Sequence, residues 1–154
     1  MTNRIGISAA LRFIVGFSAV AALPLAASGQ QAPPGAMAGL GAPPDPKVAV
    51  SWDRYFDHQT LGEIGERLEE AWPDRCRLSS IGESVEGREL WLLTVTDFRS
   101  GEADAKPAMW IDGNIHANEV QGSEIALYTA WYLCEMADRV DWIAELLRDR
   151  TFYI

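Results

Sequence analysis

Residues 107–119 read PAMWIDGNIHANE, and the architecture of the whole chain can be worked out from this stretch. Its first five residues form a short hydrophobic run of the kind that makes a buried strand. Residues 112–114, DGN, then break the strand, and a helical pattern runs from Glu119 to about Ala137. A strand that leads through a turn into a helix is typical of an α/β sheet.

The residues before this stretch predict a helix followed by a hairpin. Thr60 and Glu63 match a capping box, so we expect a helix that begins at Thr60 and ends before Pro73. Residues 76–84 and 88–96 both have strand composition, and Gly87 lies where the chain must reverse. After the stretch, residues 141–148 predict an amphipathic helix and residues 151–154 the opening of another strand.

The distribution of apolar residues predicts a sheet that is covered by other elements. Residues 90–95 are apolar on both faces of their strand, and residues 125–134 are apolar nearly all round their helix. We therefore expect Trp91, Trp110 and Trp131 in the core. The fold class is α/β, a partial mixed β-sheet covered by helices, and the apolar strand at residues 151–154 predicts that the chain is cut short.

Composition indicates a globular domain and excludes some partners. The chain has 154 residues, of which 48% are hydrophobic and 23% charged, and this argues against disorder. Its formal net charge of −9 offers no surface for phosphates, so nucleic acid is not an expected partner.

The N-terminal residues have the layout of an export signal. Arg4 and Arg12 precede an uncharged run over residues 13–27, which small residues follow. We assign residues 1–28 to a signal peptide and residues 29–47 to a linker rich in Pro, Gly and Ala. The run is too short for a stable membrane anchor, so the protein is expected to be exported and to be secreted or periplasmic.

The two histidines of the chain differ in their surroundings. His58 is expected to be a solvated loop residue ahead of the first helix. His116 follows a strand end, and Glu119 comes three residues later, so the two side chains can supply two of the ligands that a tetrahedral zinc needs. Glu119 has a second interpretation, as an acidic residue that interacts favourably with the helix dipole.

Two stretches together carry a family resemblance. Residues 82–91, GESVEGRELW, and residues 107–119 closely resemble segments of the zinc metallocarboxypeptidases related to carboxypeptidases A and B. The resemblance covers about residues 51–154 and includes the order of the helix, the hairpin and the following strand. It implies that residues 48–154 are the N-terminal portion of a zinc carboxypeptidase-like catalytic domain, with His116 and Glu119 as the first two ligands of one Zn²⁺.

The resemblance also implies what this chain does not contain. In that family the third zinc ligand, a His, and the general-base Glu lie far downstream, so no catalytic residue is expected within this chain and both groups are expected beyond Ile154. The substrate-binding residues are likewise unknown here. Asn118 stands where the digestive enzymes carry Arg, so their substrate preference does not transfer to this chain.

The function that follows is zinc-dependent removal of C-terminal residues from peptides or proteins, represented by an incomplete chain that is inactive alone. Two alternatives stay open: a zinc deacylase or amidohydrolase on the same fold, and a non-catalytic binding protein that has lost the metal site. The pairing of Cys76 and Cys134 also stays open, because an exported protein favours disulfides but buried thiols are common in apolar helices.

Overall fold

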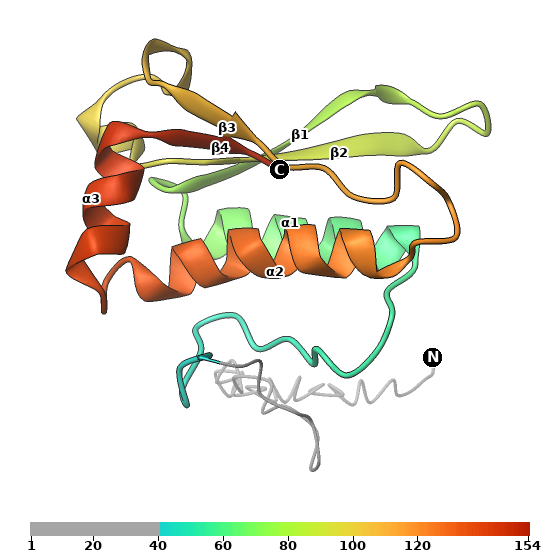
Figure 1. Cartoon of the computed structure of the whole chain (residues 1–154), viewed down its shortest axis with the longest axis horizontal. Helices are drawn as coiled ribbons and strands as arrows, with labels where there is room; N and C mark the ends of the chain where they lie inside the picture. Colours follow the sequence, from blue (N-terminus) through green and yellow to red (C-terminus); the bar gives the residue numbers. More distant parts are fainter. Residues whose placement is uncertain (1–40) are drawn as a thin grey trace, which may run out of the picture.

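The computed structural model describes residues 41–154 and consists of one layer of strands and one layer of helices (Figure 1). The predicted signal peptide and residues 29–40 of the predicted linker lie outside the described residues. Helices α1 (His58–Ala71) and α2 (Gln121–Met136) run side by side under the same face of the sheet (Figure 1). In the described part of the chain, no helix is both long enough and apolar enough to cross a membrane.

The sheet is mixed, as the sequence predicts. Its strands are β1 (Cys76–Glu83), β2 (Glu89–Val95), β3 (Ala108–Trp110) and β4 (Thr151–Tyr153), in the spatial order β1-β2-β4-β3. The β1–β2 and β2–β4 pairs are antiparallel, and β3 and β4 are parallel. The expected hairpin is confirmed, and Gly87 has the positive φ of 74° that its turn requires.

Helix α1 begins earlier than the capping-box prediction. Asp57 is the N-cap, and its Oδ1 accepts a hydrogen bond of 2.8 Å from the amide of Thr60. Glu63 instead accepts a hydrogen bond from Gln59, so the capping box at Thr60 is wrong. Asp is at least as good an N-cap as Thr, and the earlier start adds residues to the helix. Hydrogen bonds from the Thr60 side chain, and then from its backbone, lower the pKa of Asp57.

The remaining helical segments lie on both sides of β3: two short turns come before it, and α2 and α3 come after it. Residues 97–106 contain two short 3-10 turns at Phe98–Ser100 and Ala103–Ala105. Helix α3 (Asp141–Asp149) is amphipathic as expected and buries Ile143 and Leu147. Helix α2 begins at Gln121 and not at Glu119, because residues 116–122 form hydrogen-bonded turns ahead of it.

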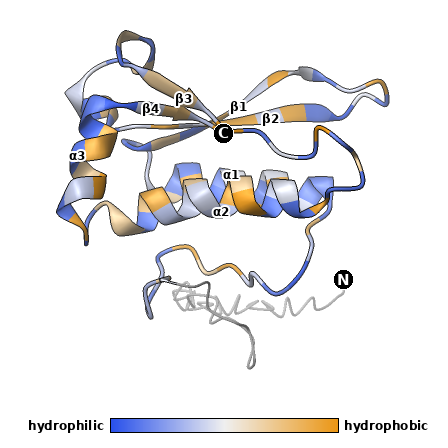
Figure 2. Cartoon of the chain, in the orientation of Figure 1, coloured by the Kyte–Doolittle hydropathy of each residue, from blue (hydrophilic) through white to orange (hydrophobic). Residues whose placement is uncertain are grey.

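The core lies between the sheet and the helices, and it includes only part of what the sequence predicts. Trp131 is 1% exposed and belongs to it, whereas Trp91 and Trp110 are 37% and 57% exposed, so their assignment to the core is wrong. The apolar residues of β2 and β3 are visible in Figure 2. β4 pairs only with residues 93–95 of β2, and the helices cover one face of the sheet, so Leu90 also stays 44% exposed.

Helix α2 is less deeply buried than its composition predicts. Its C-terminal half contributes Ala130, Trp131 and Leu133 to the core, but Ile125 is 65% exposed. The helix packs against α1, which runs beside it, against β2 of the sheet and against α3 (Figure 1). The prediction of burial on all sides is therefore wrong for the first turns of the helix.

Residues 41–57, called here the N-terminal strap, lie on the side of the helices that faces away from the sheet (Figure 1). Both backbone groups of Val48 are bound by α2: its amide donates to Glu135 Oε1 at 2.8 Å, and its carbonyl accepts from Trp131 Nε1 at 2.7 Å. Further along the strap, the Phe56 amide donates to Glu124 Oε1 at 2.9 Å. The strap is therefore hydrogen-bonded to α2 at two places, Val48 and Phe56.

Candidate metal centre

The loop between β3 and α2, residues 111–120, positions the two predicted metal ligands. It begins in register with the sheet, because the Ile111 amide donates to the Tyr153 carbonyl at 2.8 Å. The backbones of Gly113 and Gly122 then touch: a Cβ on Gly122 would lie 2.7 Å from the Asn114 amide nitrogen, and a Cβ on Gly113 would collide with the Gly122 carbonyl. Two glycines at this contact allow the end of β3 to meet the start of α2.

Asn114 fixes the direction of the loop. Its φ of 61° is left-handed, a conformation that Asn adopts more readily than most residues with a side chain. Its Oδ1 accepts a hydrogen bond of 2.8 Å from the amide of Ser123, in the first turn of α2. The side chain thereby satisfies one of the amides that a helix start leaves without an intrahelical partner. The loop is closed by this bond on one side and by the glycine contact on the other.

His116 and Glu119 lie together on the turn that this closure creates. The Glu119 amide donates to the His116 carbonyl at 3.0 Å, and the side chains meet with His116 Nδ1 3.0 Å from Glu119 Oε2. Both side chains face solvent, with exposed fractions of 72% and 56%. Their approach was predicted from the sequence spacing, although Glu119 precedes the helix and is not in its first turn.

This geometry fits two ligands of one zinc ion. The Nδ1–Oε2 separation of 3.0 Å is that of a hydrogen bond between the two side chains, and two atoms held tetrahedrally at zinc-ligand bond lengths would lie slightly further apart, at about 3.4 Å. Imidazole nitrogen and carboxylate oxygen are both ordinary zinc donors. Because the pair is exposed, further ligands can approach it without displacing packed side chains.

A third ligand is not found near this pair. Within residues 41–154, no three His, Cys, Asp or Glu side chains are grouped so that they could hold a metal ion. His58, the other imidazole, is the first residue of α1, and its Nε2 lies 2.8 Å from the Glu89 carbonyl oxygen. Its ring also stacks on the Trp91 ring, with 5.8 Å between the ring centroids, so the prediction of a solvated loop imidazole is wrong.

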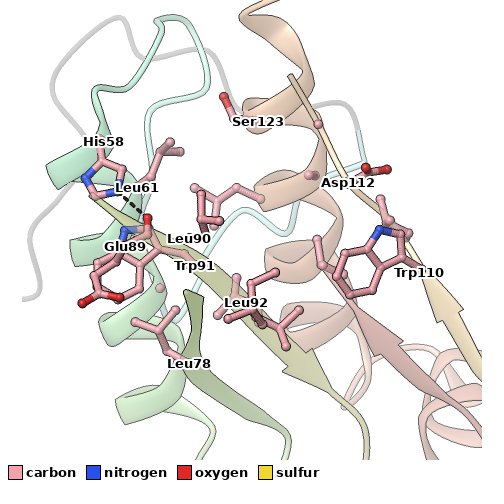
Figure 3. A pocket seen from close by; sticks show the side chains of 18 residues that line it. His58, Leu61, Leu78, Glu89, Leu90, Trp91, Leu92, Trp110, Asp112 and Ser123 are labelled. Atoms are coloured by element: carbon pink, nitrogen blue, oxygen red, sulfur yellow. Dashed lines mark hydrogen bonds between the residues drawn. The ribbon is translucent and has the colours of Figure 1, made fainter. Parts of the chain in front are cut away.

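A cavity of about 430 Å³ lies beside the loop, between the sheet and helices α1 and α2 (Figure 3). His58 and Trp91 lie at one side of it and Trp110 at the other (Figure 3). Most of its lining is apolar, and neither His116 nor Glu119 is part of that lining. The cavity therefore lies between the sheet and the helices, and His116 and Glu119 meet outside it.

Sequence reasoning did not find two features that position the loop: the contact between Gly113 and Gly122, and the hydrogen bond from the Ser123 amide to Asn114. The pattern of residues 112–114 identifies a break in the strand, but it does not say which later residues the break contacts. The signal that was available is the Gly113-Asn114 dipeptide, since both residue types tolerate backbone conformations that other residues avoid. The identity of Gly122 as the partner requires the fold.

We expect Gly113→Ala to destabilise the protein by about 1–3 kcal/mol, because the new methyl group meets backbone that cannot rotate away. Hydrogen exchange at the Ser123 amide should become faster, since the loop that carries its acceptor is displaced. Urea unfolding and amide exchange measure the two effects. Asp112→Ala, at the exposed neighbouring position, is the control and should stay within about 0.5 kcal/mol of the parent. Equal stability of the two variants would contradict the prediction.

Comparison with known protein families gives one match that contains the loop. A family model described as zinc carboxypeptidase matches residues 63–154. The catalytic chain of carboxypeptidase N from Rattus norvegicus is 37% identical over 83 residues, which are 53% of this chain and 18% of the relative. The corresponding chain from Homo sapiens is 34% identical over 108 residues, which are 70% of this chain and 24% of the relative.

Solved structures give the same fold. Thrombin activatable fibrinolysis inhibitor matches with a TM-score of 0.59 and 29% identity, over 68% of this chain and 25% of that chain. Carboxypeptidase A from Helicoverpa armigera matches with a TM-score of 0.58 and 16% identity, over 75% of this chain and 27% of that chain, and this likeness concerns the fold alone. The present chain spans less than a quarter of the length of both carboxypeptidase N relatives.

Proposed function

Because the chain belongs to the zinc carboxypeptidase family, we propose that residues 48–154 are the N-terminal portion of a zinc-dependent hydrolase that removes C-terminal residues from peptides or proteins. The observation that carries the proposal is the approach of His116 Nδ1 and Glu119 Oε2 to 3.0 Å on an exposed turn. Both residues lie inside the segment that the family model matches. In this proposal they are two protein ligands of one Zn²⁺.

The chain's own residues would hold and orient the metal. Zinc, when bound, supplies polarisation of the scissile carbonyl and a lowered pKa for a bound water. Glu119 can ligate only as a carboxylate, and His116 only with its Nδ1 deprotonated. The hydrogen bond to Asn114 and the contact between Gly113 and Gly122 keep the turn in place, so the two donor atoms would bind a metal ion without reordering the loop. The remaining ligand and the general base are expected from the part of the catalytic domain that this chain does not span.

We also propose that the protein is exported. The support is the charge and hydrophobic layout of residues 1–28, which lie outside the described structure. Export would bring the enzyme to peptides and protein C-termini outside the cytoplasm. Substrate preference does not follow from the chain, because Asn118 is neutral where the digestive enzymes carry a guanidinium.

The test uses the full product of the reading frame that encodes this chain. The purified protein should contain one zinc per molecule and should release C-terminal residues from a panel of peptides. His116→Ala and Glu119→Gln should both lose the metal and reduce kcat/KM at least about a thousandfold, because a three-ligand catalytic site does not tolerate the loss of one ligand. His58→Ala is the matched control, since His58 is the other imidazole and lies outside the pair.

The same assay separates the alternatives. Cleavage of acylated amino acids without release of C-terminal residues would replace the peptidase by a deacylase. A protein that binds no zinc and turns over neither substrate class would be a binding protein, and the proposed enzymatic function would then be wrong. Full activity in the His116→Ala variant would contradict the assignment of the ligand pair.

A further inference from the structure

The core contains two thiols that no part of the proposed mechanism uses. Cys76 is the first residue of β1 and Cys134 lies in the last turns of α2, and both are 0% exposed. They are the only cysteines of the 154-residue sequence, so each is the other's only possible partner within the chain. Both are free thiols in the structure and belong to the same hydrophobic cluster.

Independent contacts hold the two cysteine-bearing segments together. Arg75, directly before Cys76, donates from Nη1 to the Cys134 carbonyl at 3.1 Å. The same guanidinium makes a two-point contact with the Asp138 carboxylate, at 2.6 and 3.1 Å. The Arg75 side chain is only 11% exposed, whereas the Asp138 side chain is 68% exposed, so the guanidinium is buried while its carboxylate partner faces solvent. The backbones that carry the two thiols are therefore fixed next to each other by groups other than sulfur.

The thiols themselves are in direct contact. A hydrogen bond with the Cys76 thiol, and after it burial, raises the pKa of the Cys134 thiol well above its usual value. The raised pKa disfavours the thiolate of Cys134, and a protonated thiol is a poor nucleophile. Any reaction between them must take place before the core closes or during its transient opening.

We propose that Cys76 and Cys134 form an intramolecular disulfide that joins the start of β1 to the last turns of α2. The oxidant is a disulfide of the glutathione class. One cysteine thiolate attacks a glutathione sulfur and releases one glutathione thiolate, and the second cysteine then attacks the mixed disulfide and releases the other. Two thiols lose two protons and two electrons, and glutathione disulfide is reduced to two thiols.

The cross-link encloses the part of the chain that carries the proposed metal ligands. The closed loop runs from Cys76 to Cys134 and contains β1, β2, β3 and the loop at residues 111–120. A loop of this length restricts the unfolded chain strongly, which favours the folded state. In an exported protein the oxidising surroundings would keep the bond formed.

The experiment refolds the full 154-residue chain in buffer containing oxidised and reduced glutathione, then labels free thiols with an alkylating reagent in denaturant. We expect no alkyl group on the protein and an intact mass about 2 Da below that of the reduced chain. Labelling in denaturant reports buried and aggregated thiols equally. After reduction, the melting temperature should fall by about 10 °C or more, because the loop constraint is lost.

Matched variants complete the test. The double variant with Cys76→Ser and Cys134→Ser should show no change in melting temperature on reduction. The single variant Cys76→Ser should carry one glutathione on Cys134, which shows that the oxidant reaches this thiol. Two alkylated cysteines after refolding, or a disulfide found only between two chains, would overturn the proposal. A loss of peptidase activity in the full product would not affect it, since neither cysteine belongs to the metal-binding pair.

Discussion

The 154-residue chain by itself is expected to release zinc on dialysis and to leave peptide C-termini uncleaved. His116 and Glu119 provide two donor atoms, whereas catalytic zinc sites use three protein ligands and a water. Within residues 41–154 no other group of donors can complete the set. Relative to a complete enzyme, the chain should lack nearly the whole rate enhancement, which is on the order of a millionfold or more.

The measurement compares zinc content after dialysis with turnover of a panel of peptides. The parent chain and its His116→Ala variant should behave alike in both assays, because a two-ligand contact holds the metal too weakly to survive dialysis. A zinc carboxypeptidase of the same family, treated in parallel, shows that the dialysis spares a complete site. One equivalent of retained zinc, with turnover that disappears in His116→Ala, would show that this chain is an enzyme on its own.

The parts of the structure that the sequence predicts are those that depend on neighbours close in the chain. The β1–β2 hairpin needs only two strand-forming runs and Gly87 at the reversal, and both lie within one short segment. The approach of His116 to Glu119 is similar, since a separation of three residues brings side chains together in any tight turn. The family resemblance rests on the same two stretches and is confirmed by the match over residues 63–154.

The parts that fail depend on which distant segments meet. Trp91 and Trp110 have the composition of core residues, but burial of a strand residue is decided by the elements that cover it. His58 was expected in solvent because its sequence neighbours are polar, yet β2 supplies both a carbonyl acceptor and an aromatic face for its ring. None of these contacts leaves a local signal.

The contacts of the N-terminal strap are a further case, and they lead to the largest stability effect that we expect. Residues 41–47 fall in the predicted linker, and Asp45 nevertheless pairs with Arg139 at 3.1 Å. The strap is held chiefly through Val48, whose carbonyl is bound by the Trp131 indole. Trp131 therefore joins three parts of the molecule: α2 itself, the core between the helices and the sheet, and the strap on the opposite side of the helix.

Trp131→Ala should destabilise the protein by about 3–5 kcal/mol, which is a large share of the stability of a domain of this size. The indole is 1% exposed, so its removal leaves a cavity among residues that cannot fill it, including Trp52, whose ring is 5.4 Å away. The Val48 carbonyl also loses its donor at 2.7 Å. Chemical denaturation followed by circular dichroism measures the change.

Two control variants separate the causes. Trp142→Ala removes the same side chain from a position that is 61% exposed and should stay within about 0.5 kcal/mol of the parent. Trp131→Phe keeps most of the apolar contact but cannot donate to Val48, so it should cost about 1–3 kcal/mol, the penalty for a buried acceptor left unpaired. If Trp131→Phe were as damaging as Trp131→Ala, the hydrogen bond to the strap would account for the whole effect. If both were as mild as Trp142→Ala, Trp131 would not hold the strap to the core.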